Sequence, residues 1–387
     1  MSRHIIFRLL IGAAALATLA CDNSAAPGLV SGPVTVVTGL DPAFTILPSG
    51  GTDRIYTVRP KDATTRLLDA RKADGTIVWS ATIPACEAGY PCFPVVDNLG
   101  NIYIPTSQGL TSLKSDGTLR WTNAAATFRW VAAGTNGRVY AVDHGLQPTV
   151  YALDGTTGTS LWKTLLVGAS ILPIVVDETR STVYAGGRGG PIALDIQTGS
   201  VKWSVSRSCF GESQEALASD GTIYVTCDSD FTSIMYAYDP TGTEKWHTSL
   251  GTAAGTFTPL VDDGGNIYGS NPTSVTSLSP SGAVNWRLTG LTQNFVHPAI
   301  DANKNVYIIA KLTSSAAWNL LVVKDGVVTS NKGAIDPTFA GALLLAPDGK
   351  LYYNSRGTLT SFDTGVGASP TAPWAQFGRD YARTSRR

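Results

Sequence analysis

Few residues in this chain have the types and the spacing that catalysis requires. Its four histidines are His4, His144, His247 and His297, and none stands in the pattern of a Ser/His/Asp triad or of a metal site. Nucleophile-elbow, phosphate-loop and zinc-protease motifs are also absent from the sequence. We therefore expect no catalytic residues and no metal site. An active site assembled from distant blades is the alternative.

Two acidic segments, Asp262-Asp-Gly-Gly265 and Asp301-Ala-Asn-Lys-Asn305, resemble the beginnings of calcium-binding loops. An EF-hand needs a longer loop that ends in a bidentate Glu, and neither segment has one. Each segment lies between two short apolar runs, where a cluster of Asp, Gly and Asn is typical of a hairpin turn. We interpret both segments as turns and expect no bound calcium.

The cysteines indicate export rather than catalysis. Apart from Cys21, the chain has Cys86, Cys92, Cys209 and Cys227, and an even number in an exported protein favours disulfides. The simplest pairing is local: Cys86 with Cys92 across a short loop, and Cys209 with Cys227 across neighbouring strands. Metal binding is the competing interpretation, and it is disfavoured because no histidine lies near either pair.

The first twenty residues have the pattern of a secretory leader. Arg3 and Arg8 supply positive charge, and an Ala-rich apolar run follows them. The run ends in Thr18-Leu-Ala-Cys21, which resembles the lipobox at which bacterial lipoproteins are cut and lipidated on the cysteine. We expect removal of residues 1–20, a lipid on Cys21 and a flexible tether over 21–42. The alternative is an ordinary secretory peptide with a coincidental cysteine.

Composition narrows the location and the class of partner. The chain has 29 basic and 29 acidic residues, whereas a nucleic-acid-binding protein needs a basic face. No later apolar run is long enough to span a bilayer, so the lipid is the only membrane contact that we expect. The leader and the lipobox-like segment that ends at Cys21 predict a protein of the bacterial cell envelope. It would lie on the periplasmic face of the outer or inner membrane or on the cell surface.

Internal repeats in the sequence indicate the architecture of the chain. An apolar residue followed by Tyr recurs eight times at intervals of about 42 residues. A Trp series runs in phase at spacings of 40 to 43 residues, with a Gly four residues before each Trp. The tyrosines are Tyr56, Tyr103, Tyr140, Tyr184, Tyr224, Tyr268, Tyr307 and Tyr352, and the tryptophans are Trp79, Trp121, Trp162, Trp203, Trp246 and Trp286. Ser330 takes the Trp position of the seventh unit, and Trp374 follows a longer turn in the eighth.

Each unit has the pattern of four short strands separated by Gly-containing turns. A four-stranded unit of about 42 residues has the size of one propeller blade. The sequence therefore predicts an all-β fold: one monomeric eight-bladed β-propeller of four-stranded antiparallel blades over residues 43–377, followed by a basic tail at 378–387. A seven-bladed ring is the alternative.

The third and fourth strands carry a specific family resemblance. Segments 152–162 and 193–203 resemble the Ala-Leu-Asp-x-x-Thr-Gly-x-x-x-Trp repeat of the PQQ-like (quinoprotein-type) β-propellers, and segment 237–246 matches it with one residue deleted. In that family the Trp packs between adjacent blades and docks on the turn of the next unit. The resemblance implies this blade-docking role for the six tryptophans named above.

The family contains both PQQ-dependent dehydrogenases and repeat proteins without a cofactor. The dehydrogenases use a disulfide between adjacent cysteines and calcium ligands, but this chain has no adjacent cysteine pair and lacks long inter-blade insertions. A lipobox followed by eight units is similar in layout to the outer-membrane assembly lipoproteins of the BamB type. The resemblance implies a non-enzymatic, lipid-anchored scaffold for an envelope protein partner, without PQQ or calcium. A propeller that binds carbohydrate or cell wall is the alternative, and a PQQ-dependent dehydrogenase is less favoured.

Propellers bind ligands at the axial mouth, which the first strands and their incoming loops line. The polar or aromatic residues expected there are Arg129, Trp130, Glu212, Gln214, Glu215 and His297. They either form a rim that recognises a partner or are ordinary loop residues, with Trp130 filling the core, and we favour the second interpretation. Trp318, in the loop-like stretch 314–318, either anchors an interface or packs where Ser330 replaces the repeat Trp.

Overall fold

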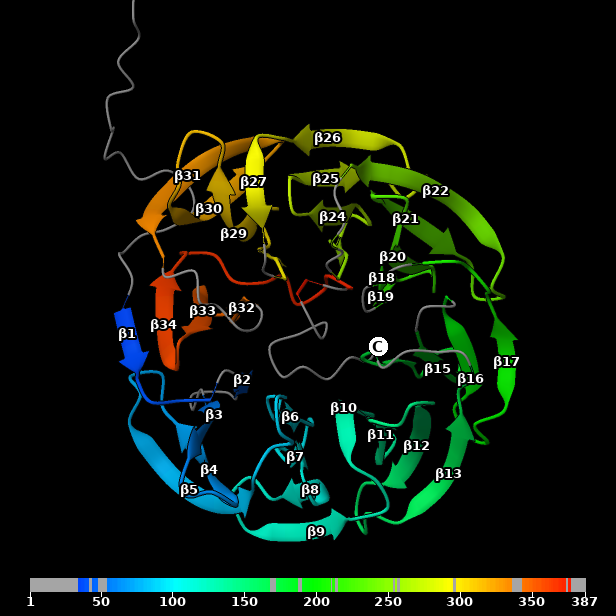
Figure 1. The fold of residues 1–387 in the computed structure, drawn as a ribbon, viewed down its shortest axis with the longest axis vertical. Coiled ribbons are helices and arrows are strands. Elements are labelled where there is room, and N and C mark those ends of the chain that lie inside the picture. The colour runs from blue at the N-terminus through cyan, green and yellow to red at the C-terminus, as the bar shows by residue number, and fades with distance from the viewer. Residues whose placement is uncertain are drawn as a thin grey trace, which may run out of the picture.

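Eight antiparallel sheets surround a central axis like the blades of a propeller (Figure 1). The computed structural model describes residues 34–41, 44–47, 54–167, 172–186, 190–209, 211–212, 215–252, 255, 258–294, 297–335, 343–373 and 375–376, and these residues contain no helix. The predicted eight-bladed all-β propeller is confirmed, and the seven-bladed alternative is wrong.

The first four blades follow one another along the chain, each built from its innermost to its outermost strand. Blade one contains β2 (Phe44–Leu47), β3 (Arg54–Pro60), β4 (Thr65–Arg71) and β5 (Ile77–Pro84). Blade two contains β6 (Val95–Val96), β7 (Ile102–Thr106), β8 (Gly109–Leu113) and β9 (Leu119–Asn123). Blade three contains β10 (Phe128–Ala133), β11 (Arg138–Asp143), β12 (Thr149–Asp154) and β13 (Ser160–Leu165). Blade four contains β14 (Val175–Asp177), β15 (Thr182–Ala185), β16 (Ile192–Asp195) and β17 (Val201–Ser204).

In blades five and seven the first strand is split into two parts that pair with the same second strand. Blade five contains β18 (Gly211–Glu212), β19 (Ala216–Leu217), β20 (Ile223–Ser229), β21 (Thr232–Tyr238) and β22 (Glu244–Gly251). Blade six contains β23 (Leu260–Val261), β24 (Ile267–Asn271), β25 (Ser274–Leu278) and β26 (Val284–Leu288). Blade seven contains β27 (Leu291–Asn294), β28 (Ala299–Ile300), β29 (Val306–Leu312), β30 (Trp318–Lys324) and β31 (Val327–Ala334).

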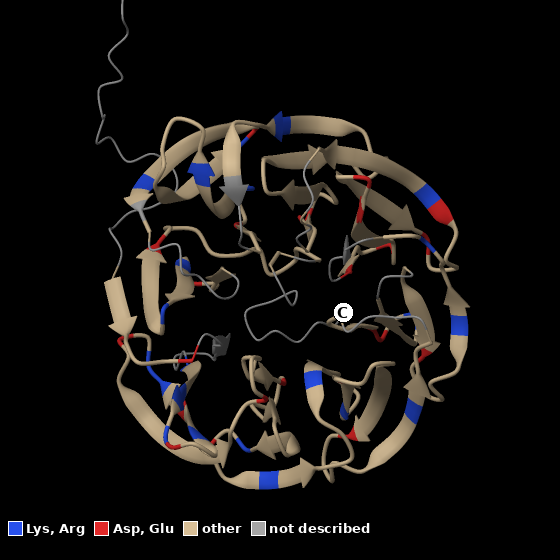
Figure 2. Ribbon diagram, viewed as in Figure 1, with Lys and Arg blue, Asp and Glu red and all other residues tan. Residues whose placement is uncertain are grey.

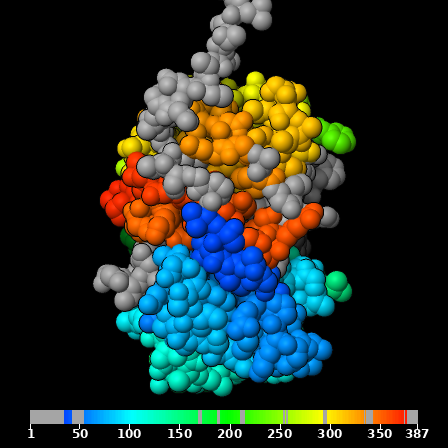
Figure 3. Space-filling model, turned by 90° about the vertical axis from the view of Figure 1, so that its left-hand side faces the viewer, coloured from blue at the N-terminus to red at the C-terminus, as the bar shows by residue number. Residues whose placement is uncertain are grey.

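An N-terminal strand completes the eighth blade. Its inner strands are β32 (Leu344–Leu345), β33 (Lys350–Ser355) and β34 (Thr358–Asp363), and β1 (Val34–Val37) pairs with β34 as the outermost strand. Figure 3 shows β1 between the orange-red atoms of blade eight and the lighter blue atoms of blade one. The predicted tether over 21–42 is therefore too long, because the propeller already begins at Val34.

The chain after β1 links the first and last blades. The Leu40 amide donates to the Gly357 carbonyl of blade eight, and the Asp41 amide donates to the Val58 carbonyl of blade one. The Asp41 carboxylate also accepts from Arg66 of blade one at 3.0 Å. The ring is thus closed by segments that lie at opposite ends of the sequence.

The repeat tryptophans dock on the following blade. The indole N–H groups of Trp79, Trp121, Trp162, Trp203 and Trp246 donate to turn carbonyls of the next blade at 2.8 to 3.2 Å. The rings lie against the turn glycines of those blades, so a Cβ added at Gly158 or Gly199 would approach a Trp ring to 2.5 Å. Trp286 lies against Gly326 in the same way. The Trp and Gly series of the repeat are therefore the two halves of one contact.

Trp374 and Trp318 differ from the sequence-based interpretation. Trp374 lies outside the described residues, and the strand register places Val34, rather than a tryptophan, at the Trp position of blade eight, opposite Ser361. Trp318 starts strand β30 instead of lying in a loop, and it is buried in the core between blades seven and eight. The Lys311 ammonium lies 5.1 Å from its ring centroid. Trp318 is therefore not an exposed interface anchor.

After β34 the chain returns toward the centre of the ring (Figure 1). Gln376 is fully buried there; its Oε1 accepts the Leu345 amide of blade eight at 2.6 Å. It also forms an isolated bridge with Ala299 of blade seven. This segment joins the inner strands of the last two blades.

Candidate functional site

The loops of the propeller divide between two faces, because neighbouring strands run antiparallel. The connections between blades, such as 85–94 and 124–127, lie on the same side as the loops between second and third strands, such as 144–148. We call this side the connection face. The turns at 97–101 and 114–118 lie on the opposite side, which we call the turn face.

A group of aromatic and basic side chains lies on the connection face, between the start of blade three and the connection that precedes blade two. Trp130 stacks on Phe93, with ring centroids 5.6 Å apart and planes 13° from parallel. Tyr90 meets the His144 ring edge to face at 4.8 Å, and the Arg129 guanidinium lies 4.0 Å from the Tyr90 ring centroid. All five side chains are half-buried. We call these five residues the aromatic–arginine cluster.

A disulfide loop positions one side of this cluster. Cys86 and Cys92 are bonded, with Cα atoms 5.3 Å apart, and close the short loop that carries Tyr90. The Glu87 carboxylate on this loop lies 2.9 Å from Nδ1 of His144, so the loop is tied to blade three. The cross-link limits the conformations from which Tyr90 contacts blade three.

A β-bulge positions the other side. The register between β10 and β11 shifts between Phe128 and Trp130, which leaves Arg129 as the extra residue of the strand. A bulge of this kind changes the direction of the side chain and is often found beside functional sites. The Arg129 guanidinium consequently lies near both Tyr90 and Trp130, 5.8 Å from the latter ring centroid.

The second predicted disulfide is also present on the connection face. Cys209 precedes the first strand of blade five and is bonded to Cys227 of β20, with Cα atoms 5.5 Å apart. Beside it, the Arg207 guanidinium lies 4.1 Å from the Tyr236 ring centroid and donates to the Tyr238 hydroxyl at 2.5 Å.

Arg207 also forms an ion pair with Glu244 of the outermost strand β22. His247 lies 2.7 Å from the same carboxylate. The hydrogen bond from His247, followed by the charge of Arg207, holds the pKa of Glu244 below its usual value. The guanidinium of Arg207 thus has both a hydroxyl and a carboxylate partner within the chain.

Of the predicted rim residues, Arg129 and Trp130 lie in the aromatic–arginine cluster. Trp130 also packs against the core between blades three and four, as in the favoured interpretation. Glu215 is fully buried, and its carboxylate lies against Gly186. Glu215, a candidate for the rim, is thus neither exposed there nor an ordinary loop residue, because the neighbouring blade covers the start of the first strand.

The remaining predicted rim residues are not brought to this cluster. The Thr258 amide lies 3.4 Å from Nδ1 of His297, and the Leu343 amide lies 3.3 Å from its carbonyl oxygen, so His297 links blades six and eight. The backbone of Glu212 belongs to β18, whereas its side chain and all of Gln214 lie outside the described residues. Tyr90, Phe93 and His144 were not predicted as part of the site, because only the tertiary structure brings their loops to Arg129.

The acidic hairpins that resemble calcium loops use their carboxylates internally. Asp262 accepts from the Asn266 amide and the Tyr268 hydroxyl, both at 2.9 Å. Asp301 accepts from Asn305 and Tyr307 at 2.7 and 2.8 Å. Among the described residues, no group of three or more His, Cys, Asp or Glu side chains could hold a metal ion.

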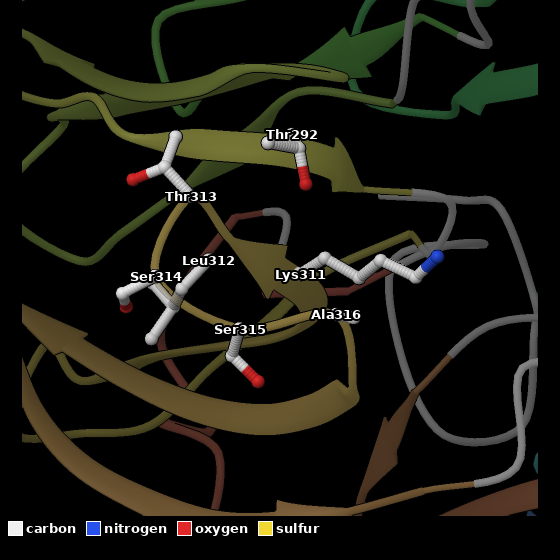
Figure 4. A pocket seen from close by; sticks show the side chains of 7 residues that line it. All are labelled: Thr292, Lys311, Leu312, Thr313, Ser314, Ser315 and Ala316. Atoms are coloured by element: carbon white, nitrogen blue, oxygen red, sulfur yellow. The ribbon is translucent and has the colours of Figure 1, made fainter.

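Two further surface features do not form a convergent site. A hollow of about 490 Å³ beside blade seven is lined by Thr292, Lys311 and the loop at 312–316. Figure 4 shows that its hydroxyl groups and the Lys311 ammonium point in different directions, so they do not surround one ligand position. Basic segments are spaced around the outer strands of the described ring, and acidic segments lie mainly in turns and inner parts, so neither sign forms one continuous block there (Figure 2). No helix in the described parts of the chain is long and apolar enough to cross a membrane.

Apolar loop tips accompany the aromatic–arginine cluster on the connection face. Leu146, two residues after His144, is fully exposed. Val167 and Phe231, on connections and loops of the same face, are also largely exposed. Exposed apolar side chains near aromatic and arginine residues are typical of protein-interaction surfaces.

Comparison with known families identifies the type of repeat. Residues 61–217 match the family described as outer membrane protein assembly factor BamB. The match covers less than half of the chain, and together with the eight-bladed architecture it supports a propeller built of PQQ-like repeats. One curated relative, the serine/threonine-protein kinase AfsK of Streptomyces coelicolor, is 34% identical over 129 residues, which are 32% of this chain and 15% of that protein.

Solved structures share the fold at low sequence identity. BamB from Moraxella catarrhalis superposes with a TM-score of 0.61 at 17% identity, covering 87% of this chain and 99% of that one. The C-terminal WD40 domain of Sif2 superposes with a TM-score of 0.65 at 12% identity, covering 89% and 100%. Because propellers with different repeats match equally well, these likenesses concern the fold.

Proposed function

We propose that this propeller of PQQ-like repeats is a non-enzymatic scaffold of the bacterial cell envelope, anchored by a lipid on Cys21. The observation that carries the proposal is the aromatic–arginine cluster on the connection face, flanked by the exposed Leu146. Tyr, Trp and Arg are the residue types that dominate the binding energy of protein interfaces. The partner is a protein of the same compartment.

The most specific form of the proposal is a role like that of BamB in outer-membrane protein assembly. It is supported by the family match over residues 61–217 and by the lipobox that ends at Cys21. Two disulfides on the connection face are compatible with an oxidising compartment. A shared propeller does not by itself define the partner, so the test must recover it.

A pair of exposed leucines provides a matched test. Leu146 belongs to the connection face and Leu99 to the turn face, and both are largely exposed loop residues. The lipidated chain is crosslinked in cells, solubilised in detergent and purified, as wild type, Leu146→Asp and Leu99→Asp. We expect a stoichiometric envelope protein with the wild type and with Leu99→Asp, and its loss with Leu146→Asp.

Recovery of the chain alone from wild-type membranes would contradict the scaffold proposal. Retention on peptidoglycan or glycan without a protein partner would support the carbohydrate-binding alternative instead. Dye-linked oxidation of alcohols or sugars after addition of PQQ and calcium would contradict the non-enzymatic part of the proposal.

A further inference from the structure

Arg129 has an unusual combination of order and unused hydrogen-bonding capacity. Its guanidinium is held 4.0 Å from the Tyr90 ring centroid and 5.8 Å from that of Trp130. A guanidinium carries five N–H donors in a planar fork that matches a carboxylate. Within the described parts of the chain, no carboxylate lies in ion-pair distance of Arg129.

Arg207 is a second arginine that lies against a tyrosine ring, and its carboxylate partner belongs to the chain itself. It lies 4.1 Å from the Tyr236 ring centroid, close to the distance between Arg129 and Tyr90. Its N–H groups donate to the Tyr238 hydroxyl and to the Glu244 carboxylate. The two arginines therefore have similar aromatic support, but of the two only Arg207 has a carboxylate partner among the described residues.

The acid nearest in sequence to Tyr90 is already engaged. Glu87, on the same disulfide loop, is paired with His144 at 2.9 Å. The loop thus places the Tyr90 ring against Arg129, while its carboxylate, Glu87, pairs with His144. The bulge leaves Arg129 without a register partner on β11.

We propose that Arg129 is a preorganised binding point for a carboxylate of the partner protein, an Asp or Glu side chain held by the guanidinium between the Tyr90 and Trp130 rings. Stacking fixes the plane of the fork before binding, so less side-chain entropy is lost when the two parallel hydrogen bonds form. The inference deepens the proposed function by naming the partner's recognised group, and it rests on the connection face being the interaction surface.

The direct test is a titration followed at the arginine side chains. The detergent-solubilised full chain is labelled with 15N-arginine, and the Nε–Hε resonances of Arg129 and Arg207 are assigned from Arg129→Lys and Arg207→Lys. The probe is acetyl-Gly-Leu-Glu-Leu-Gly-amide, with the Gln-containing peptide as its uncharged match. We expect saturable shifts of the Arg129 resonance, with a dissociation constant on the order of 1 mM, and no shift at Arg207.

Affinity measurements with the variants separate the contribution of the planar guanidinium to peptide binding from that of its positive charge. Arg129→Lys retains the positive charge but loses the planar fork, so we expect peptide binding to weaken roughly tenfold. Arg207→Lys should leave the affinity unchanged. The Gln peptide should bind the wild type roughly tenfold more weakly than the Glu peptide.

Three results would overturn the inference: equal affinity for the Glu and Gln peptides, unchanged affinity in Arg129→Lys, or tighter binding of inorganic phosphate than of the Glu peptide. Failure here is distinguishable from failure of the scaffold proposal. A partner recovered equally with wild type and Arg129→Gln would contradict the role of Arg129 and leave the scaffold proposal standing.

Discussion

At the scale of single residues, equivalent tyrosines of the repeat differ by one hydrogen bond. The Tyr307 hydroxyl donates to Asp301 at 2.8 Å, whereas the Tyr56 hydroxyl is buried without a hydrogen-bond partner in the described structure. Burial raises the pKa of both phenols, and the Asp301 charge adds to the effect at Tyr307. The repeat position therefore requires an aromatic ring in both blades but uses the hydroxyl in one.

We predict that Tyr307→Phe lowers the free energy of unfolding by about 1–2 kcal/mol, because Asp301 loses a donor in a buried site. Tyr56→Phe is the matched control, and its effect should lie within about 0.5 kcal/mol of the wild type. Urea denaturation of both variants measures the difference. Equal effects would show that the Tyr307–Asp301 bond adds no stability.

At the scale of strands and turns, a row of three residues across each blade explains the in-phase series. Tyr184 on β15 is opposite Ala193 on β16, which is opposite Trp203 on β17. The small central residue lets the Tyr and Trp rings approach to 5.8 Å between centroids. Ala or Ser takes the central position in the six blades that have the Trp.

In the seventh blade the central residue of the row is larger and the outer residue is smaller than in the six blades that have the Trp. Its row is Tyr307, Val322 and Ser330, so a larger central residue accompanies the loss of the Trp. Total volume across the row is thereby partly conserved, as close packing between blades requires. Val322 therefore offsets part of the volume lost at Ser330, and Trp318 packs in the same core as Tyr307 and Val322.

The turn glycines should differ in their tolerance of a side chain. Gly199 and Gly137 have similar positive φ values of 73° and 75°, but a Cβ on Gly199 would meet the Trp162 ring at 2.5 Å, whereas one on Gly137 would meet nothing within 4 Å. We predict that Gly137→Ala costs about 1 kcal/mol from the backbone alone. Gly199→Ala should cost roughly 1–3 kcal/mol more, because it displaces the docked Trp.

Chemical denaturation of the two glycine variants, with Trp fluorescence as the probe, measures both costs. The emission of Trp162 should also change in the folded state of Gly199→Ala and remain unchanged in Gly137→Ala. Equal costs would argue against Trp docking as the reason for the repeat glycine.

At the scale of the whole molecule, ring closure depends on the first described strand. β1 supplies the outermost strand of blade eight, and Asp41 then contacts blade one through Arg66. A propeller without this strand has an open edge and two blades that are joined less firmly. Closure therefore couples the N-terminal segment to the stability of the entire ring.

Two truncations test this coupling. A chain that begins at Val34 should unfold at the same temperature as one that begins at Cys21, because the removed residues precede β1. A chain that begins at residue 42 should unfold roughly 5 °C or more lower, since it loses a paired strand and the contacts of Asp41. Thermal unfolding followed by circular dichroism gives the midpoints, and equal values for both truncations would contradict closure by β1.

Much of the fold was predictable because the same contact between blades recurs in successive repeats. Each of the first six blades has a Tyr on its second strand, a small residue on its third, and a Trp that meets the turn Gly of the next blade. Such a pattern is visible in one sequence, since each requirement recurs about every 42 residues. The disulfide pairings were predictable because each cysteine has a partner nearby in the sequence.

The closing strand and the site were not predictable in this way, because each depends on a contact that occurs once. Val34–Val37 consists of four β-branched residues, which favour a strand, but its pairing with β34 joins opposite ends of the chain and is not visible in the sequence. Arg129 and Trp130 could be proposed as rim residues, but their partners Tyr90 and Phe93 lie on a connection from another blade.

The sequence by itself determined the number of blades and the residues that dock them, because repeated local patterns specify strands, turns and packing volumes. Only the tertiary structure decided that β1 closes the ring, that Glu215 is buried and that Arg129 stacks on Tyr90 without an acidic partner in the described chain. The physical reason is that these features arise from side chains and edges brought together by the closed circle, and a single unrepeated contact leaves no periodic signal in the sequence.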